Sequence, residues 1–114
     1  MSKQFRFRDD SLKLNIEGHD FTIVDIYNPH TAKTLAETGE KLININFENK
    51  DADEIQKTIN DIVKEVTTIL LGQDAFKKIF NGRSVKISEA IQLFDFLNEE
   101  ITEHKANSVM NKYE

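Results

Sequence analysis

The chain has 114 residues, enough for a single domain with one modest core. Its formal net charge of −5 disfavours broad nucleic-acid binding, and its lack of cysteine excludes disulfides, thiolate metal sites and a cysteine nucleophile. Hydrophobic residues make up 39% of the sequence and charged residues 31%, which is typical of a globular protein rather than a disordered one.

The opening segment, residues 1–10, lacks the apolar core of a signal peptide and interleaves aromatic with cationic side chains at Phe5, Arg6, Phe7 and Arg8. Its pattern fits an edge strand or an arm, and we expect it to be flexible. Some single-strand nucleic-acid binders interleave residues in this way. Acidic residues follow at once, however, so the favoured interpretation has Phe5 and Phe7 packed on the domain with both arginines in water.

The next segment predicts a β-hairpin. Leu12, Leu14 and Ile16 alternate with polar residues, which is the period of a half-buried strand. Turn-forming residues follow at 17–20, and the β-branched and aromatic segment 21–26 indicates the returning strand.

A first helix is predicted from Asn28, a good N-cap, and Pro29, which suits the first helical position. It runs to about Thr38, where Gly39 weakens or ends it. The segment 42–47 alternates only partly, so a further helical piece and a third strand both stay open, with helix favoured.

A long second helix is predicted after Asp51, an N-cap with Glu54 three residues later in a capping-box-like arrangement. Gly72 ends this helix as a C-cap glycine. Its core-facing stripe, at spacings of three and four, comprises Ile55, Ile59, Ile62, Val63, Val66, Ile69 and Leu70.

Two more helices complete the pattern. A short one is predicted over 73–80 and a final one from its cap Ser88, with a turn at Asn81 and Gly82 between them. The polar segment 104–114 is expected to be flexible. The stripe of the final helix comprises Ala90, Leu93, Phe94, Leu97 and Ile101, and Ile91 and Phe96 lie outside it.

The sequence offers no pattern for catalysis, a cofactor or a metal ion. The three histidines, His19, His30 and His104, lack the spacing of a helical metal site. Residues 49–53 imitate the start of a calcium loop, but the glycine and glutamate that the loop requires later are absent. No phosphate loop or nucleophile elbow occurs. Because these patterns are missing, we expect that the protein is not an enzyme. The longest apolar run, 69–71, is too short to span a bilayer, so we expect a cytoplasmic protein.

These elements predict an α+β single domain over 1–114, with an N-terminal β-hairpin packed with about four α-helices. Their order resembles that of the small tail assembly chaperones of long-tailed, siphovirus-type bacteriophages and prophages, which are also similar in length and acidity. The resemblance rests on the strand end at Ile16-Glu17-Gly18, a polar helical middle, the helix end at Leu70-Leu71-Gly72, the short helix over Phe76–Phe80 and the final helix after Ser88.

The resemblance implies a function. Such chaperones bind the tape measure protein, keep its apolar surface from aggregating until the tail tube polymerises, and are not retained in the virion. Many also have a longer, frameshifted form that recruits the tail tube protein, and members self-associate. This chain would be the short form, in the cytoplasm of the bacterial host, with no nucleic acid or membrane as partner.

An apolar groove between the last two helices would receive amphipathic helices of the tape measure protein. The residues expected to form it, chosen because they lie off the stripes or at junctions, are Leu71, Phe76, Phe80, Ile91 and Phe96. A core that wraps around the last helix is the alternative use of these side chains. Two other functional classes also stay open: another phage structural or interaction protein, such as a tail completion or scaffold component, and, less favoured, a small nucleic-acid-binding regulator.

Overall fold

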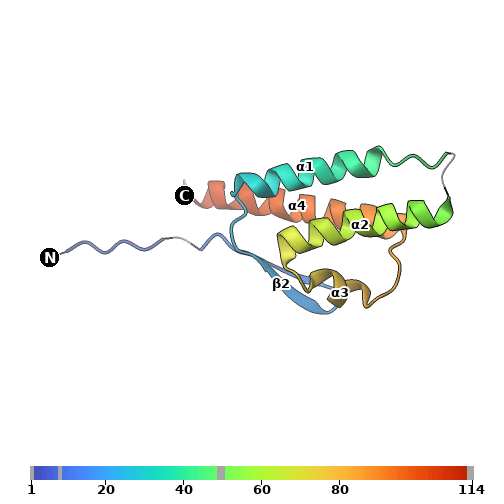
Figure 1. Cartoon of the computed structure of the whole chain (residues 1–114). Helices are drawn as coiled ribbons and strands as arrows, with labels where there is room; N and C mark the ends of the chain where they lie inside the picture. The colour runs from blue at the N-terminus through green and yellow to red at the C-terminus, as the bar shows by residue number, and fades with distance from the viewer. Residues whose placement is uncertain (1, 8, 49–50, 113–114) are drawn as a thin grey trace.

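The computed structural model describes residues 2–7, 9–48 and 51–112. A β-hairpin and a short helix lie together at one side of the molecule, and three longer helices run side by side (Figure 1). The prediction of an α+β fold with a hairpin and four helices is therefore confirmed. In chain order the elements are β1 Leu12–Ile16, β2 His19–Ile23, α1 Pro29–Ile43, α2 Ala52–Leu71, α3 Ala75–Phe80 and α4 Ile87–Lys112.

The hairpin is antiparallel, with Leu14 opposite Phe21, and its apolar side chains face the core. Its turn consists of Glu17 and Gly18, with φ angles of 52° and 81°. Positive φ at both central residues is typical of a type I′ turn, whose twist suits adjacent antiparallel strands. Because the turn takes only two residues, β2 begins at His19, earlier than the predicted return at residue 21.

Helix α1 begins as predicted, because the side chain of Asn28 accepts a 2.9 Å hydrogen bond from the amide of His30. Its predicted end near Thr38 is wrong, since the helix continues through Gly39 to Ile43. Glycine costs only about 1 kcal/mol inside a helix, and packing of α1 against α2 and α4 outweighs that cost. Residues 44–47 are neither helix nor strand, so the favoured helix over 42–47 holds only for its first two residues.

Helix α2 begins after Asp51 and ends at Gly72, as the caps predict. Most of its predicted stripe is buried, but Ile69 is 53% exposed. The buried face is rotated towards Thr67, which is fully buried. The hydroxyl of Thr67 donates to the carbonyl of Val63 at 2.8 Å, and this bond lets a polar side chain occupy the core.

The last two helices differ from their predicted bounds by small amounts. Helix α3 begins two residues late, at Ala75, and the chain leaves it through Asn81 in the left-handed region. Helix α4 begins at Ile87, one residue before the predicted cap Ser88, and the side chain of Glu89 accepts a hydrogen bond from the amide of Lys86, the residue that precedes the helix. The backbone of residues 104–112 continues α4, so this part of the predicted flexible end is helical, and its flexibility stays a prediction.

The described residues before β1 form an extended arm that projects away from the helices (Figure 1). Phe5 and Phe7 are 76% and 90% exposed, so the expectation that they pack on the domain is wrong. Their rings contact each other instead, with centroids 4.9 Å apart. The hairpin face that could have received them is already buried against the helices.

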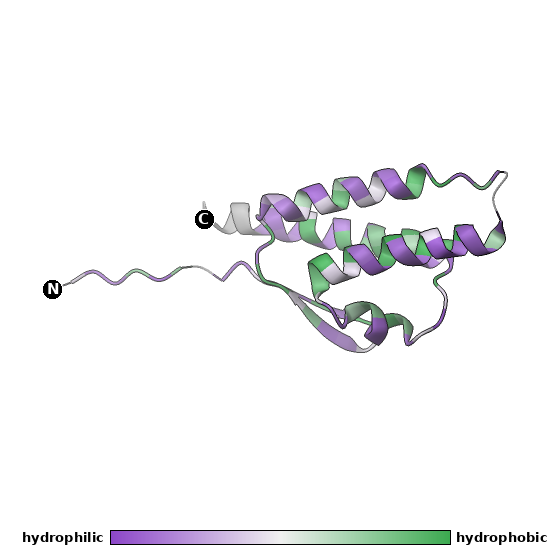
Figure 2. Ribbon diagram, viewed as in Figure 1, coloured by the Kyte–Doolittle hydropathy of each residue, from purple (hydrophilic) through white to green (hydrophobic). Residues whose placement is uncertain are grey.

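The core is continuous and lies between the hairpin and the helices. Hydrophobic and hydrophilic residues alternate along each long helix, as one buried stripe per helix requires (Figure 2). In α4 the buried members of the predicted stripe are Ala90, Leu97 and Ile101, whereas Leu93 and Phe94 are half-buried. Within the described part of the chain, no helix combines the length and apolarity needed to cross a membrane.

Candidate functional site

The candidate site is a cavity of about 300 Å³ where the hairpin turn, α3 and the first half of α4 meet. It opens to solvent and combines an apolar floor with a polar rim. Its lining comprises Asn15, Ile16, Glu17, Ile79, Phe80, Arg83, Glu89, Gln92, Leu93 and Phe96.

One wall of the cavity is aromatic. The ring of Phe80 is buried, and the ring of Phe76 lies against it with centroids 5.2 Å apart and an interplanar angle of 41°. The guanidinium carbon of Arg83 stands 5.1 Å from the Phe80 centroid, within range of a cation–π contact. Phe96, from α4, is half-buried and completes the apolar surface.

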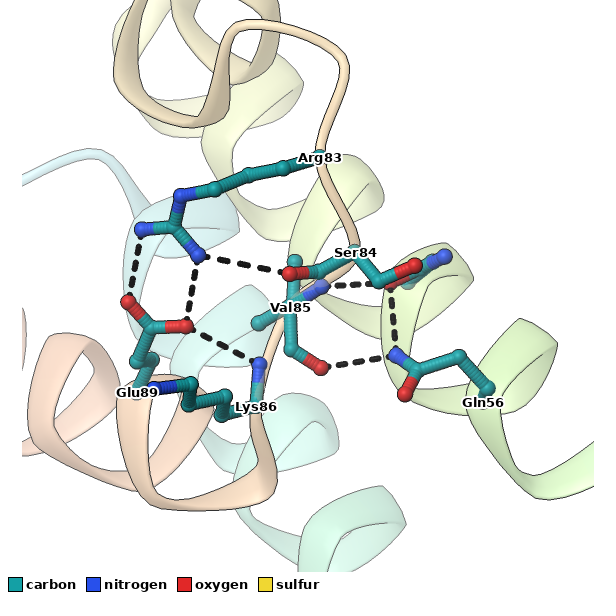
Figure 3. A network of polar contacts seen from close by, with 7 residues as sticks. Gln56, Arg83, Ser84, Val85, Lys86 and Glu89 are labelled. Carbon is teal, nitrogen blue, oxygen red and sulfur yellow. Dashed lines mark hydrogen bonds and ion pairs between the residues drawn. The ribbon is translucent and has the colours of Figure 1, made fainter. Parts of the chain in front are cut away.

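The rim of the cavity carries a two-pronged ion pair (Figure 3). Arg83 donates to both carboxylate oxygens of Glu89, at 2.8 and 2.7 Å. The same carboxylate accepts a 3.0 Å bond from the amide of Lys86, which caps α4. The hydrogen bond from Arg83, and after it the bond from Lys86, lowers the pKa of Glu89 to about 2. Both partners of the ion pair are therefore charged at neutral pH.

The linker between α3 and α4 is clamped onto α2 (Figure 3). The side-chain amide of Gln56 donates to the carbonyl of Val85 at 2.7 Å, and the amide of Val85 donates to Oδ1 of Asn60 at 3.0 Å. Gln56 also donates to that Asn60 oxygen, at 3.1 Å. Because Val85 is fully buried, these bonds satisfy polar backbone groups that water does not reach. The clamp holds the linker that leads into α4 against α2.

The structure gathers part of the predicted groove. Phe80 and Phe96 line the same cavity, and Phe76 joins them through its contact with Phe80. Leu71 packs against the core at the end of α2 and does not line the cavity. Ile91 is 46% exposed and lies five residues before Phe96, about 140° away around the helix, so it belongs to another face of α4.

Sequence reasoning missed the polar rim and the contribution of the hairpin. Glu89 carries a local signal, since an acid three residues after a helix cap often bonds back to the cap. Arg83 meets Glu89 only because the linker turns between them, and Ile16 reaches the cavity only through tertiary packing. No local sequence pattern predicts the contact between Arg83 and Glu89 or the position of Ile16 at the cavity.

The chemistry of the cavity favours binding. Its surface combines aromatic and aliphatic side chains with the Arg83–Glu89 ion pair and a second acid, Glu17, which suits an apolar side chain flanked by polar groups. Across the ranges that the structure describes, no three histidine or acidic side chains come together as a potential metal site. His19 and His30 are exposed and lie on different elements.

The comparisons with known proteins assign no family. A scan against protein-family models gave no match, and searches of the curated proteins and of the solved structures gave none either. Inference about function therefore starts from the order of the elements and from the surfaces described above.

Proposed function

We propose that this chain is a tail assembly chaperone of the kind made by long-tailed bacteriophages and prophages. It binds the tape measure protein in the cytoplasm of the bacterial host, keeps that protein soluble until the tail tube polymerises, and leaves before the virion is complete. It acts by binding, without catalysis, metal or cofactor. The observation that carries the binding role is the cavity between α3 and α4, in which the half-buried ring of Phe96 stays partly open to solvent.

The size of the cavity favours a protein side chain as its occupant. About 300 Å³ is at the lower limit of small-molecule sites, which span roughly 300–1,000 Å³. An amphipathic helix presents one or two large apolar side chains per turn and could insert one between Phe80 and Phe96. The Arg83–Glu89 pair at the rim then faces the polar flank of that helix.

The charge of the chain supports the same role. A net charge of −5 on a small domain keeps a complex soluble when its partner is rich in apolar helices. In this proposal a longer, frameshifted form of the protein adds a segment that recruits the tail tube protein.

Co-expression with the long helical protein encoded in the same genome tests the proposal. We expect the partner to become soluble and to co-elute with this chain, with light scattering giving one defined mass for the complex. A partner that stays insoluble while this chain elutes alone would remove the main support for the chaperone role.

Matched variants test whether binding of the partner depends on the cavity. Phe96→Ser removes an apolar wall, and Gln92→Lys places a charge at the exposed rim without touching the core. Both should reduce the co-eluting partner, whereas Phe47→Ser removes an aromatic ring that is 55% exposed outside the cavity and should not. Circular dichroism of each variant alone checks that the fold is retained.

Two experimental outcomes would favour the two alternative functions, a phage structural component and a nucleic-acid-binding regulator. Retention of this chain in purified tails would indicate a structural component, because a chaperone leaves. Steeply salt-dependent binding to DNA would indicate a nucleic-acid-binding regulator.

A further inference from the structure

The cavity between α3 and α4 continues along α4 as an acidic surface. Three glutamates follow Phe96, which lines the cavity, by three, four and seven residues, so they lie on the same face of the helix as Phe96. They are Glu99, Glu100 and Glu103, of which the first and the last are exposed and Glu100 is half-buried. We call these three residues the acidic strip.

Within the described part of the chain, the acidic strip has no cationic partner. The next lysine on α4, Lys105, lies roughly 160° around the helix from Glu103. Its ammonium stands 5.8 Å from the centroid of the Tyr27 ring, on that other side. The carboxylates of the strip are therefore available to cations of another molecule.

The lining of the cavity adds to the negative charge. Glu17 lines it from the hairpin turn and Glu89 from α4. Among the described lining residues Arg83 is the one cation, and it already donates to both carboxylate oxygens of Glu89. The lining and the strip together carry five acids and one cation. The exposed Lys13 and Lys86, which flank this surface in sequence, do not reverse that balance.

We propose that the cavity and the acidic strip together select a helix with a large apolar side chain and with lysine or arginine one and two turns away on the same face. The apolar side chain enters the cavity between Phe80 and Phe96, and the cations meet the strip. Seven residues of helix rise about 10 Å, so cations four and seven residues from the apolar side chain match the length of the strip. This inference rests on the binding role proposed above and narrows it to basic amphipathic segments of the partner.

The two parts of the surface act differently. Burial of the apolar side chain supplies most of the affinity, whereas exposed ion pairs add little singly and together fix which helix binds and in which register. Like charges would repel a helix with an acidic flank. The strip does not serve as a metal site, because no three acidic or histidine side chains of the described residues come together as ligands.

Two synthetic helical peptides of about 18 residues, each held helical by a hydrocarbon staple, test the proposal. Both contain a central leucine and the same lysines. In the first, the lysines lie four and seven residues to either side of the leucine, on its face; in the second, they lie on the opposite face. Calorimetry at about pH 8, where histidines are neutral, gives the dissociation constants. We expect the first peptide to bind roughly tenfold tighter, with a smaller preference at high salt.

Matched variants assign this preference to the strip. Glu99→Gln with Glu103→Gln should reduce it at least about threefold. Glu40→Gln with Asp61→Asn removes the same charge from exposed positions on α1 and α2 and should leave the preference unchanged. Equal affinity for the two peptides, binding of neither, or an undiminished preference in the strip variant would overturn the proposal.

Co-expression with the long helical partner separates this inference from the chaperone role. We expect less co-eluting partner with the strip variant than with the parent chain. Equal amounts with both proteins would contradict the charge preference and leave the chaperone role standing. A partner that co-elutes with neither, while the peptides bind as expected, would contradict the chaperone role alone.

Discussion

Gly39 of α1 lies directly against the ring of Phe94 of α4. A Cβ atom added at Gly39 would stand 3.1 Å from Cζ of Phe94, closer than nine in ten real contacts of this kind. The position is helical and does not need the positive φ that glycine permits, so close approach between two helices is the reason for glycine here. Gly39 and Phe94 both line a concave surface between α1 and α4.

Substitutions at Gly39 should therefore depend on size. Gly39→Ala gains up to about 1 kcal/mol in helix propensity, and displacement of the half-buried Phe94 ring offsets part of it, so we expect a small net stabilisation. Gly39→Leu forces α1 and α4 apart and should cost about 1–3 kcal/mol in the free energy of unfolding. Urea unfolding of the three proteins measures the difference. A Gly39→Leu protein as stable as the parent would show that the two helices are not held at this distance.

The Arg83–Glu89 pair predicts a pH dependence of stability. The pKa of Glu89 is lowered from 4.5 to about 2 in the folded state, so the pair stabilises the fold above about pH 4.5 and loses this contribution as the pH falls towards 2. Both side chains are partly exposed, at 49% and 28%, and screening by solvent reduces the contribution to about 1 kcal/mol.

Glu89→Gln isolates this effect. The variant should unfold about 1 kcal/mol more easily at neutral pH, and its difference from the parent should shrink as the pH falls from 4.5 towards 2. Thermal unfolding across that range, with Glu99→Gln on the exposed face of the same helix as control, gives the comparison. A difference that is constant with pH would assign the loss to the helix cap alone.

The clamp on Val85 predicts a larger cost for removing its acceptor. Asn60→Ala leaves the buried amide of Val85 without its partner and should destabilise the protein by about 1–3 kcal/mol. Asn60→Asp keeps an acceptor oxygen at the same place and should cost clearly less at neutral pH. Equal losses for the two substitutions, measured by denaturant unfolding, would show that the hydrogen bond is not the source of the stability.

The hairpin turn offers a stabilising change. Glu17 adopts a φ of 52°, which costs roughly 1 kcal/mol for most side chains but less for asparagine. Glu17→Asn creates the Asn-Gly pair that type I′ turns prefer, and should raise the unfolding free energy by about 0.5 kcal/mol or more. Gly18→Ala, at a φ of 81°, should act in the opposite direction. Lower stability for Glu17→Asn in thermal unfolding would contradict the turn geometry.

Local chemistry in the sequence was enough to predict most of the fold. The alternation from Leu12 predicts the hairpin, the cap at Asn28 predicts the start of α1, and the caps at Asp51 and Gly72 predict both ends of α2, as the structure confirms. The errors arise where tertiary contact outweighs local preference, as at Gly39, which stays helical beneath Phe94.

The candidate site was less predictable than the fold. Phe80 and Phe96 could be selected because they lie off the helical stripes or at a junction, but the partner of Arg83 and the role of Ile16 depend on how distant elements meet. The same is true of the arm. Its alternation suggested a packed strand, whereas the hairpin has no free apolar face for Phe5 to cover.

Hydrogen exchange of this chain, free and in complex with the co-expressed long helical protein proposed as its partner, tests the central claim most directly. The account predicts slower exchange in α3 and in the first half of α4, the two walls of the cavity, with little change along α1. Slower exchange confined to α1 and the distal half of α4, or none anywhere in the described helices, would contradict the assignment of this cavity as the binding site.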